Sequence, residues 1–366
     1  MYKLLLVTEQ SFYPEVSGGS EISTAYLLSE LHRRNWQVEV ICSSSLKNSS
    51  WSKSWWTKIK SLRLFPPVFR DLEQGYTVWR ILSKFTHGKK LIRLLEKKLI
   101  NYRPQVVLGL VDINCPLLNH ALNRGYHCFY IARVAEIIGG AEYLPPGLNI
   151  IPNSPFIASS LKSLTDQNHG VVLPFVEPTK CKVQHHQKKY VTFINPVPQK
   201  GIETVVKVAQ NMPDVQFLFV KGNWFTYKSN EEYFIKEARL LPNVEVWEHQ
   251  EDVRSIYEVT DILLVPSIFK ETFGRVILEA HINGIPVIAS NVGGIDYTLG
   301  SGGVLIDSSR GVEAYVEAIR TLKSDSKFYS SLSRLAFENS QRPEFDPEFQ
   351  INNFIAIIND YLKKYQ

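Results

Sequence analysis

The sequence of 366 residues has no long apolar run and few cysteines. No stretch reaches 18 apolar residues, and the apolar part of "MYKLLLVTEQ" is too short for a secretory signal, so we expect a cytoplasmic protein that does not span the membrane. The four cysteines (Cys42, Cys115, Cys128, Cys181) show no C-x-x-C spacing and no His pair at zinc-finger spacing. This pattern favours a reduced compartment and argues against structural zinc.

Several motifs of nucleotide and metal chemistry are also absent. The chain has no G-x-G-x-x-G, no G-x-x-x-x-G-K-[ST], no H-E-x-x-H and no D-x-D after an apolar strand. These absences argue against a dinucleotide fingerprint, a P-loop, a metalloprotease helix and a D-x-D metal site. The neighbours His185 and His186 are expected to be a solvated pair, so we predict no metal and no cofactor.

The net charge of +5 is distributed unevenly. Residues 1–172 contain 20 Lys and Arg against 12 Asp and Glu, whereas the rest of the chain contains 21 against 24. Within the basic half, the stretch 51–69 ("WSKSWWTKIKSLRLFPPVF") combines three Trp with four basic residues. Trp beside Lys and Arg is typical of contact with anionic lipid, which predicts peripheral membrane binding through 51–69. A loop that packs its Trp inside is the alternative, and no motif indicates a nucleic acid partner.

The order of predicted elements indicates an α/β protein with two domains, which the length also favours. Short, fully apolar runs alternate with helical segments, which is typical of parallel sheets with right-handed crossovers. Strands are predicted at 2–7, 37–42, 105–110, 127–132 and 148–153, then at 190–195, 215–220, 244–247, 261–267 and 286–290. Helices are predicted near 20–34, 92–101, 114–124 and 155–166, then from 201 and over 274–283.

The segment 172–189 has two prolines and little periodicity, so it is predicted to link the two domains. We place the first domain at 1–172 and the second at 173–348. The amphipathic segment 349–365 reads as a last helix, and we expect residues 349–366 to pack back on the first domain.

The stretch "KETFGRVILEA" (270–280) contains the strongest candidate site. Glu271 follows a buried strand, and Glu279 lies inside an apolar helix. The carboxyl end of a parallel strand and the start of the next helix form a common place for phosphate, because backbone N–H groups there are unpaired. Lys200 stands at a similar strand-to-helix junction, and the glycines 293–294 follow the next strand.

These residue types suit a nucleotide that carries a sugar. A lysine can neutralise a diphosphate, a carboxylate such as Glu279 can accept hydrogen bonds from both hydroxyls of a ribose, and Glu271 can bind sugar hydroxyls. The alternative interpretation of the same residues is a salt-bridged glutamate in a helix and a solvated lysine near a helix start.

The pattern of Glu271, seven residues and Glu279, with "FGRV", "NGIPVIAS", "VGG" and "PQKG", resembles the C-terminal domain of the retaining GT-B glycosyltransferases of sequence family four, the group 1 glycosyltransferases. The N-terminal "FYPEVSGGSEISTAYLLSELHRRNWQVEVI" and "IIPNSPFIASSL" (150–161) are similar to other parts of that family. The resemblance covers nearly the whole chain and is most specific over 190–303.

The resemblance implies two Rossmann-like, doubly wound domains facing a deep cleft that holds a nucleoside diphosphate sugar, with retention at the anomeric carbon and no required metal. By position, Lys200 would hold the diphosphate, Glu279 the ribose and Glu271 the transferred sugar. The remaining candidates for substrate contact are Gly18, Gly19, Asn195, Thr272, Phe273, Gly274 and Arg275.

Three positions depart from the family pattern. Asn195 and Pro196 stand where an Arg often precedes the lysine, so one phosphate cation is missing. Asp296 and Tyr297 occupy the region of a frequent Glu. Arg133 stands where many members have a His on the catalytic side, and it is a candidate for the same contact.

The predicted reaction is the transfer of a hexose from a nucleoside diphosphate sugar, with UDP-glucose as the preferred donor, to a hydroxyl of a glycan or lipid-linked acceptor in polysaccharide or glycolipid synthesis. No carboxylate is placed as a nucleophile, so front-face attack with electrostatic stabilisation of the leaving diphosphate is the preferred mechanism. A GT-B epimerase or hydrolase and a non-catalytic nucleotide-sugar sensor remain the alternatives.

Overall fold

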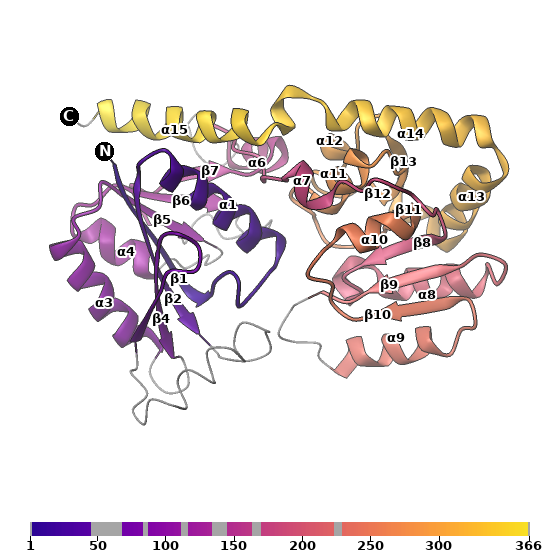
Figure 1. The fold of residues 1–366 in the computed structure, drawn as a ribbon, viewed down its shortest axis with the longest axis horizontal. Helices are drawn as coiled ribbons and strands as arrows, with labels where there is room; N and C mark the ends of the chain where they lie inside the picture. Colours follow the sequence, from indigo (N-terminus) through magenta and orange to yellow (C-terminus); the bar gives the residue numbers. More distant parts are fainter. Residues whose placement is uncertain are drawn as a thin grey trace. The chain divides into compact units, whose positions relative to one another are not determined.

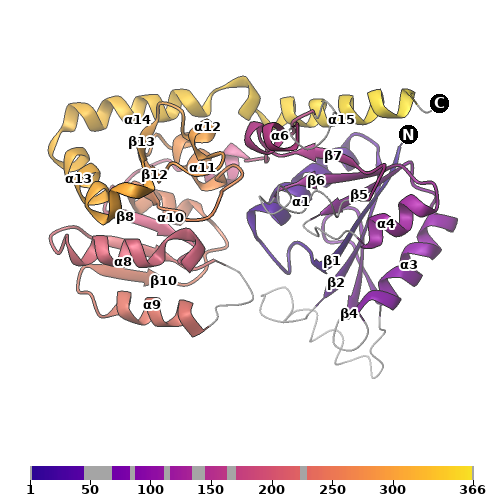
Figure 2. The ribbon, with the colours of Figure 1, turned by 180° about the vertical axis from the view of Figure 1, so that it is seen from behind.

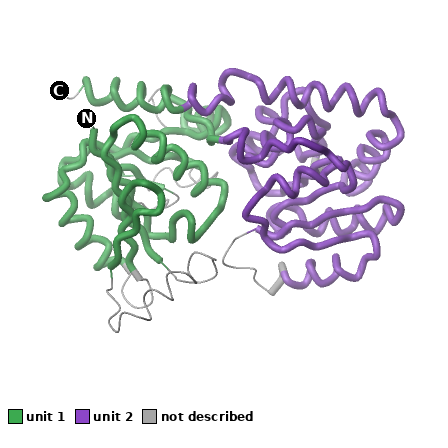
Figure 3. Tube along the Cα trace, viewed as in Figure 1, with its two compact units in different colours: residues 1–175, 351–366 green, residues 176–350 purple. Residues whose placement is uncertain are grey.

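The computed structural model describes residues 2–44, 68–82, 87–110, 116–133, 145–162, 170–222 and 229–364. The chain forms two compact units, one of residues 1–175 with 351–366 and the other of residues 176–350 (Figure 3). Each unit is a sheet covered by helices (Figure 1). The predicted α/β class with two Rossmann-like domains is therefore confirmed.

The first unit contains a seven-stranded sheet in the order β3-β4-β2-β1-β5-β6-β7. All neighbouring strands are parallel except β3, which runs antiparallel to β4. The strands are β1 (Lys3–Ser11), β2 (Gln37–Ser44), β3 (Val68–Asp71), β4 (Thr77–Leu82), β5 (Val106–Leu110), β6 (Cys128–Ala132) and β7 (Asn149–Pro152).

Helices cover both faces of this sheet because its central strands are apolar on both sides. Leu4 and Leu6 of β1 pack with α1 (Gly19–Arg33) and α15 (Pro347–Lys363). Leu5 and Val7 face the other way, onto α3 (His87–Asn101), α4 (Pro116–Asn123) and α6 (Pro155–Lys162). The two views in Figures 1 and 2 show α3 and α4 on one flank of the sheet and α15 along another. Ile351, Phe354 and Ile358 fix α15 to the core of the first unit.

The second unit contains a six-stranded parallel sheet in the order β10-β9-β8-β11-β12-β13. Its strands are β8 (Tyr190–Ile194), β9 (Phe217–Val220), β10 (Val244–Trp247), β11 (Thr260–Val265), β12 (Val287–Ser290) and β13 (Gly303–Ile306). Its helices are α7 (Pro178–Cys181), α8 (Ile202–Gln210), α9 (Ser229–Arg239), α10 (Arg254–Val259), α11 (Arg275–Ile282), α12 (Ile295–Leu299), α13 (Gly311–Ser324) and α14 (Ser326–Ser340). Single 3₁₀ turns lie at η2 (Pro198–Lys200), η3 (Ser308–Arg310) and η4 (Pro343–Phe345).

The sequence prediction found the central strands but missed β3, β4 and β13 and the helices α7, α9, α10, α12, α13 and α14. Strand β4 carries Arg80 in its interior, and β13 begins at Gly303, so neither is the apolar run that marked the other strands. Residues 114–115, 163–166 and 51–67, on which other predictions fall, lie outside the described residues.

No helix in the described part of the chain is both long and apolar enough to cross a membrane. Cys42, Cys128 and Cys181 are free thiols and are buried, whereas Cys115 is outside the described ranges. Burial raises the pKa of each of these three thiols to about 12.

Candidate functional site

The site in the second unit forms where the adjacent strands β8 and β11 end. The chain leaves β8 through η2, which ends at Lys200, and leaves β11 through the loop 266–274. The N–H of Ile268 donates to the carbonyl of Gln199 at 3.0 Å. Gly201 has φ +86°, and a Cβ there would lie 2.1 Å from the carbonyl oxygen of Pro266. A glycine is therefore required for the two crossovers to lie this close together.

Lys200 and Glu271 meet across these two crossovers. The Lys200 ammonium donates to Oε1 of Glu271, and the Ser267 hydroxyl donates to the same oxygen at 2.9 Å. The ammonium also lies 4.8 Å from the ring centroid of Phe269. The side chain of Lys200 is 25% exposed and that of Glu271 10% exposed, so the pair lies at the surface of the unit.

The crossover from β12 to α12 packs against the same loop. The N–H of Gly294 donates to the carbonyl of Glu271 at 2.7 Å. Gly293 has φ +64°, and a Cβ there would lie 2.0 Å from the carbonyl oxygen of Glu271. Gly293 of the predicted pair is therefore required by backbone packing, and the N–H of Gly294 holds the main chain that carries Glu271.

Helix α11 begins beside these loops. Gly274 is its N-cap with φ +80°, and a glycine has no side chain with which to cap the helix. The first N–H groups of a helix have no intrahelical partner, and the helix dipole favours an anion at this end. This end of α11 can therefore bind phosphate.

The two residues before Gly274 are largely buried. Thr272 is 8% exposed, and Phe273 is 2% exposed with its ring edge-on to Phe345 at 5.9 Å. The side chain of Phe273 therefore belongs to the core, and only its main chain is available for the predicted substrate contact.

Glu279 is buried in α11, and both of its carboxylate oxygens have partners. Nη2 of Arg275, one turn earlier, lies 2.9 Å from Oε1, and the Tyr257 hydroxyl of α10 donates to Oε2 at 2.7 Å. Tyr257 has no exposed surface, and burial together with the charge of Glu279 raises its pKa well above 10. The charge in the apolar run is therefore held in place by two groups. Sequence reasoning missed Tyr257 because it lies 22 residues away on a separate helix.

Asn195 stands at the end of β8, where the family pattern often has a cation nearby. Its φ is +63°, and its N–H donates to the carbonyl of Val220 at 2.8 Å. A Cβ on Gly222 would lie 2.7 Å from Oδ1 of Asn195. Among the described residues, none donates a hydrogen bond to this buried Oδ1.

Gly18, Gly19 and Arg133 belong to the first unit and lie together. Gly18 is the N-cap of α1, and Gly19 is its first residue. Arg133 follows β6, is 9% exposed and donates through Nη1 to the carbonyl of Ser20. Burial raises the pKa of Glu21 in the same turn, and the charge of Arg133 opposes this effect. The structure therefore brings Arg133 to the start of α1.

The other notable positions have structural partners. Tyr297 in α12 lies edge-on to Phe345, and the Arg342 guanidinium lies 4.6 Å from its ring centroid. Over the described ranges, no group of three or more His, Cys, Asp or Glu could hold a metal ion.

Comparison with known proteins agrees with this geometry. Residues 179–338 match the family described as "Glycosyl transferases group 1". The chain is 25% identical to spore coat protein SA of Bacillus subtilis (strain 168) over 223 residues, which is 54% of this chain and 58% of that protein. It is 30% identical to D-inositol 3-phosphate glycosyltransferase of Paenarthrobacter aurescens (strain TC1) over 155 residues, covering 39% and 37%. The chain thus spans about half the length, or less, of these relatives.

Solved structures share the fold over the whole chain. Sucrose-phosphate synthase of Thermosynechococcus elongatus superposes with a TM-score of 0.76 at 16% identity and covers 100% of both chains. HepE of Anabaena, solved in complex with UDP-glucose, gives a TM-score of 0.75 at 15% identity, also over 100% of both chains. The structural neighbours are GT-B proteins, so the predicted fold class is confirmed.

Proposed function

We propose that this protein transfers a sugar from a nucleoside diphosphate sugar to an acceptor hydroxyl, because residues 179–338 match the family described as "Glycosyl transferases group 1". One observation carries the proposal: Lys200, Glu271 and the start of α11 lie at one sheet edge, with a fixed Glu279 further along the helix. We select UDP-glucose as the donor. Support comes from HepE, which has been solved with UDP-glucose and shares the fold.

The donor's diphosphate would bind at the start of α11. The backbone N–H groups at the start of α11 would donate to its oxygens, and the Lys200 ammonium would neutralise it. Lys200 pairs with Glu271, so the phosphate would compete with that carboxylate for the ammonium. Glu271 would then be free to accept hydrogen bonds from the transferred sugar.

Glu279 would accept hydrogen bonds from the two hydroxyls of the ribose. Each carboxylate oxygen can accept more than one hydrogen bond, so the bonds from Arg275 and Tyr257 leave acceptor capacity for a ligand. The same two bonds fix the orientation of the carboxylate and lower the cost of ordering it on binding. The amide oxygen of Asn195 is a further acceptor at this edge of the sheet.

The reaction would proceed by departure of the diphosphate from the sugar carbon. Lys200 and the α11 N-terminus would stabilise the negative charge that grows on the leaving group, a contribution of about 2–4 kcal/mol for one such donor. We propose retention by attack from the same face, with a phosphate oxygen taking the proton of the acceptor. The mechanism needs no metal ion and no protein nucleophile.

The acceptor would lie on the first unit, whose residues 1–172 carry the basic excess. Gly18, Gly19 and Arg133 form one group there. We propose a glycan or a lipid-linked acceptor, with the protein in the cytoplasm and in peripheral contact with the inner face of the membrane. The Trp-rich stretch 51–69 would provide that contact, although residues 51–67 lie outside the described ones.

A donor screen tests the reaction. Thermal shifts with a panel of nucleotide sugars identify the donor, and product analysis with and without acceptor separates transfer from epimerisation and hydrolysis. NMR of the anomeric proton in the product tests retention, and a turnover assay in EDTA tests independence from metal. Binding without turnover across a broad acceptor panel would instead indicate a sensor.

Two variants test the binding roles. Glu279→Ala is expected to weaken binding of free UDP in calorimetry, and an unchanged affinity would refute the ribose assignment. Trp55→Ser with Trp56→Ser is expected to lower sedimentation with anionic vesicles at low salt while leaving UDP affinity unchanged. A wild-type protein that binds no vesicles would instead support a soluble acceptor.

A further inference from the structure

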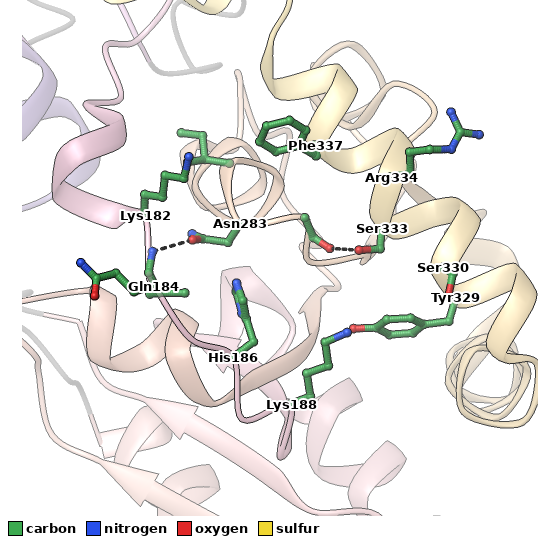
Figure 4. Close-up of a pocket in the computed structure, with 13 residues that line it drawn as sticks. Lys182, Gln184, His186, Lys188, Asn283, Tyr329, Ser330, Ser333, Arg334 and Phe337 are labelled. Atoms are coloured by element: carbon green, nitrogen blue, oxygen red, sulfur yellow. Dashed lines mark hydrogen bonds between the residues drawn. The ribbon is translucent and has the colours of Figure 1, made fainter.

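The second unit has a hollow of about 490 Å³ at the opposite end of α11 from Gly274 (Figure 4). One wall is the segment 182–188, which precedes β8, and the other is α14. The floor is the end of α11, with Asn283 and Gly284. This volume is in the range of pockets that bind small ligands. The hollow lies within one unit and shares no lining residue with the site proposed above.

The lining is basic although the unit is acidic. Residues 176–350 contain 19 Lys and Arg against 23 Asp and Glu. Among the described residues that line the hollow are Lys182, Lys188 and Arg334, and none of them is Asp or Glu. Arg334 pairs with Glu338 at 2.7 Å, outside the lining, and both side chains are largely exposed. The local positive charge is therefore a property of this hollow and not of the whole unit.

The two lysines mark the ends of the hollow. The ammonium of Lys182 lies 6.0 Å from the ring centroid of Phe337, and that of Lys188 lies 4.8 Å from the ring centroid of Tyr329. The two rings are eight residues apart on α14, which corresponds to about 12 Å along a helix. Figure 4 shows His186 and Gln184 on the wall between the lysines and Ser333 opposite them.

The backbone of this wall is held in an unusual conformation. Lys188 has φ +48°, which is rare for a residue other than glycine. Asn283 fixes the other end of the wall, because its Oδ1 accepts from the N–H of Val183 at 2.8 Å and its Nδ2 donates to the carbonyl of Cys181 at 2.9 Å. The segment 182–188 is thus fastened to the end of α11, and its lysines are presented from a fixed main chain.

The end of a helix repels anions through its carbonyl groups, but three of the last four carbonyls of α11 are already bonded. The carbonyl of Glu279 accepts from Nδ2 of Asn283, that of Ala280 from the N–H groups of Asn283 and Ile285, and that of His281 from the N–H of Gly284. The carbonyl of Gly284 accepts from the Ser333 hydroxyl at 2.6 Å. The charge of the hollow is therefore determined by Lys182, Lys188 and Arg334 and is positive.

We propose that this hollow is a second ligand site, which binds a small phosphorylated molecule with two anionic groups, one at each lysine. A phosphate would bind at each lysine, because ammonium groups form short charge-assisted hydrogen bonds to phosphate oxygens. The polar middle, with Gln184, His186 and Ser333, would contact hydroxyl groups of the ligand. A hexose bisphosphate has this chemistry.

The test is calorimetry at fixed ionic strength with glucose 1,6-bisphosphate, glucose 6-phosphate and inorganic phosphate. Saturating UDP is present throughout, so that the site at the start of α11 is blocked. We expect saturable binding of the bisphosphate, tighter than that of the monophosphate. The pair Lys182→Gln with Lys188→Gln is expected to raise the Kd at least tenfold.

A matched pair controls for net charge. Lys189→Gln with Lys327→Gln removes two cations that do not line the hollow, and it is expected to leave the Kd within twofold of wild type. The proposal is overturned by no saturable binding of the bisphosphate, by equal affinity for inorganic phosphate, or by equal effects of the two pairs. Vesicles of phosphatidylcholine with phosphatidylglycerol separate a lipid surface from a pocket. Vesicle binding that needs Lys182 and Lys188, without bisphosphate binding, would also overturn it.

Discussion

The two units bury charge in different ways. In the first, Arg80 of β4 has no exposed surface, and its Nε donates to Oδ2 of Asp71 at 3.0 Å. Its Nη1 and Nη2 donate to the carbonyls of Phe12 and Tyr13 at 3.0 and 2.7 Å, and Nη1 lies 3.9 Å from Oε2 of Glu15. Every charged partner of Arg80 is itself buried.

In the second unit, two charged pairs lie in the loop and helix that follow β11, and both are partly exposed. The side chains of Lys200 and Glu271 are 25% and 10% exposed, and those of Arg275 and Glu279 are 15% and 11% exposed. A guanidinium that is fully enclosed by its partners can act only on the fold. A pair that reaches the surface beside a helix start can exchange a partner for a ligand. The comparison therefore predicts stability effects in the first unit and binding effects in the second.

The largest effect is expected from Arg80→Met. The change leaves Asp71 and Glu15 buried without their cation, and breaking a buried pair in this way costs about 3–5 kcal/mol. Urea denaturation measures the loss. Arg70→Met is the control on the neighbouring strand, because Arg70 contacts Thr77 and the Trp79 ring at the surface, and its loss should cost at most about 1 kcal/mol. Equal effects of the two changes would contradict the structural role of Arg80.

The next effect is expected from Lys200→Ala. This change should lower kcat/KM by an amount that corresponds to about 2–4 kcal/mol of transition-state free energy, while the protein stays folded. The ammonium is the cation that faces Glu271 at the proposed phosphate site. Lys207→Ala is the control, because Lys207 belongs to the same crossover and pairs with the exposed Glu203 at 2.8 Å. Steady-state kinetics with the donor identified above gives the measurement. A wild-type rate in Lys200→Ala would remove this lysine from the mechanism.

Sequence alone predicted the elements of the second unit's site because each is local. A buried strand, a glycine and a helix follow one another over 261–282, and the same order places Lys200 after β8. The physical requirement is a parallel sheet whose strands end at one edge, so neighbouring junctions meet there. The contact between Lys200 and Glu271 follows from that topology, although the two residues are 71 positions apart.

The rest could not be predicted because it depends on partners that have no local pattern. Arg80 meets Phe12 and Tyr13 across more than 60 residues, and Tyr257 reaches Glu279 from another helix. The sequence places Gly293 after the next strand, but the close approach of the Glu271 carbonyl, 2.0 Å from where a Cβ would stand, has no sequence pattern. Such contacts arise from packing between segments and become visible only in three dimensions.

A buried titratable group of the second unit extends the comparison to pH. His281 of α11 has no exposed surface, its Nδ1 accepts from Nδ2 of Asn339 at 2.9 Å, and burial lowers its pKa to about 3. Between pH 6.5 and 3 the unfolded chain binds a proton at this residue that the folded chain does not. The contribution of neutral His281 to the free energy of unfolding is thus fully present above pH 6.5. It is lost as the pH falls, by about 1.4 kcal/mol per pH unit, or about 2 kcal/mol at pH 5.

Urea denaturation of the second unit's transition between pH 7 and 5 measures this slope. His281→Gln should make stability depend less on pH over this range, whatever the change costs at pH 7. A wild-type stability that is constant from pH 7 to 5 would show that His281 can be protonated in the folded state.

The smallest effect is expected from Tyr257→Phe. Tyr257 shares one property with the enclosed Arg80 and one with the site of the second unit. Tyr257 is enclosed like Arg80, yet its hydroxyl donates to Oε2 of Glu279, the proposed ribose ligand. Its removal frees one carboxylate oxygen to turn, so we expect UDP affinity to fall by about 1 kcal/mol, roughly fivefold. Tyr315→Phe is the control, because its buried hydroxyl bonds Ser290 at 2.8 Å without touching the site.

In the Glu279→Ala background, Tyr257→Phe should have no effect on UDP binding, since a positioning residue acts only through the carboxylate it holds. An equal loss in both backgrounds would mean that Tyr257 supports the fold of α10 and α11 and not the orientation of Glu279.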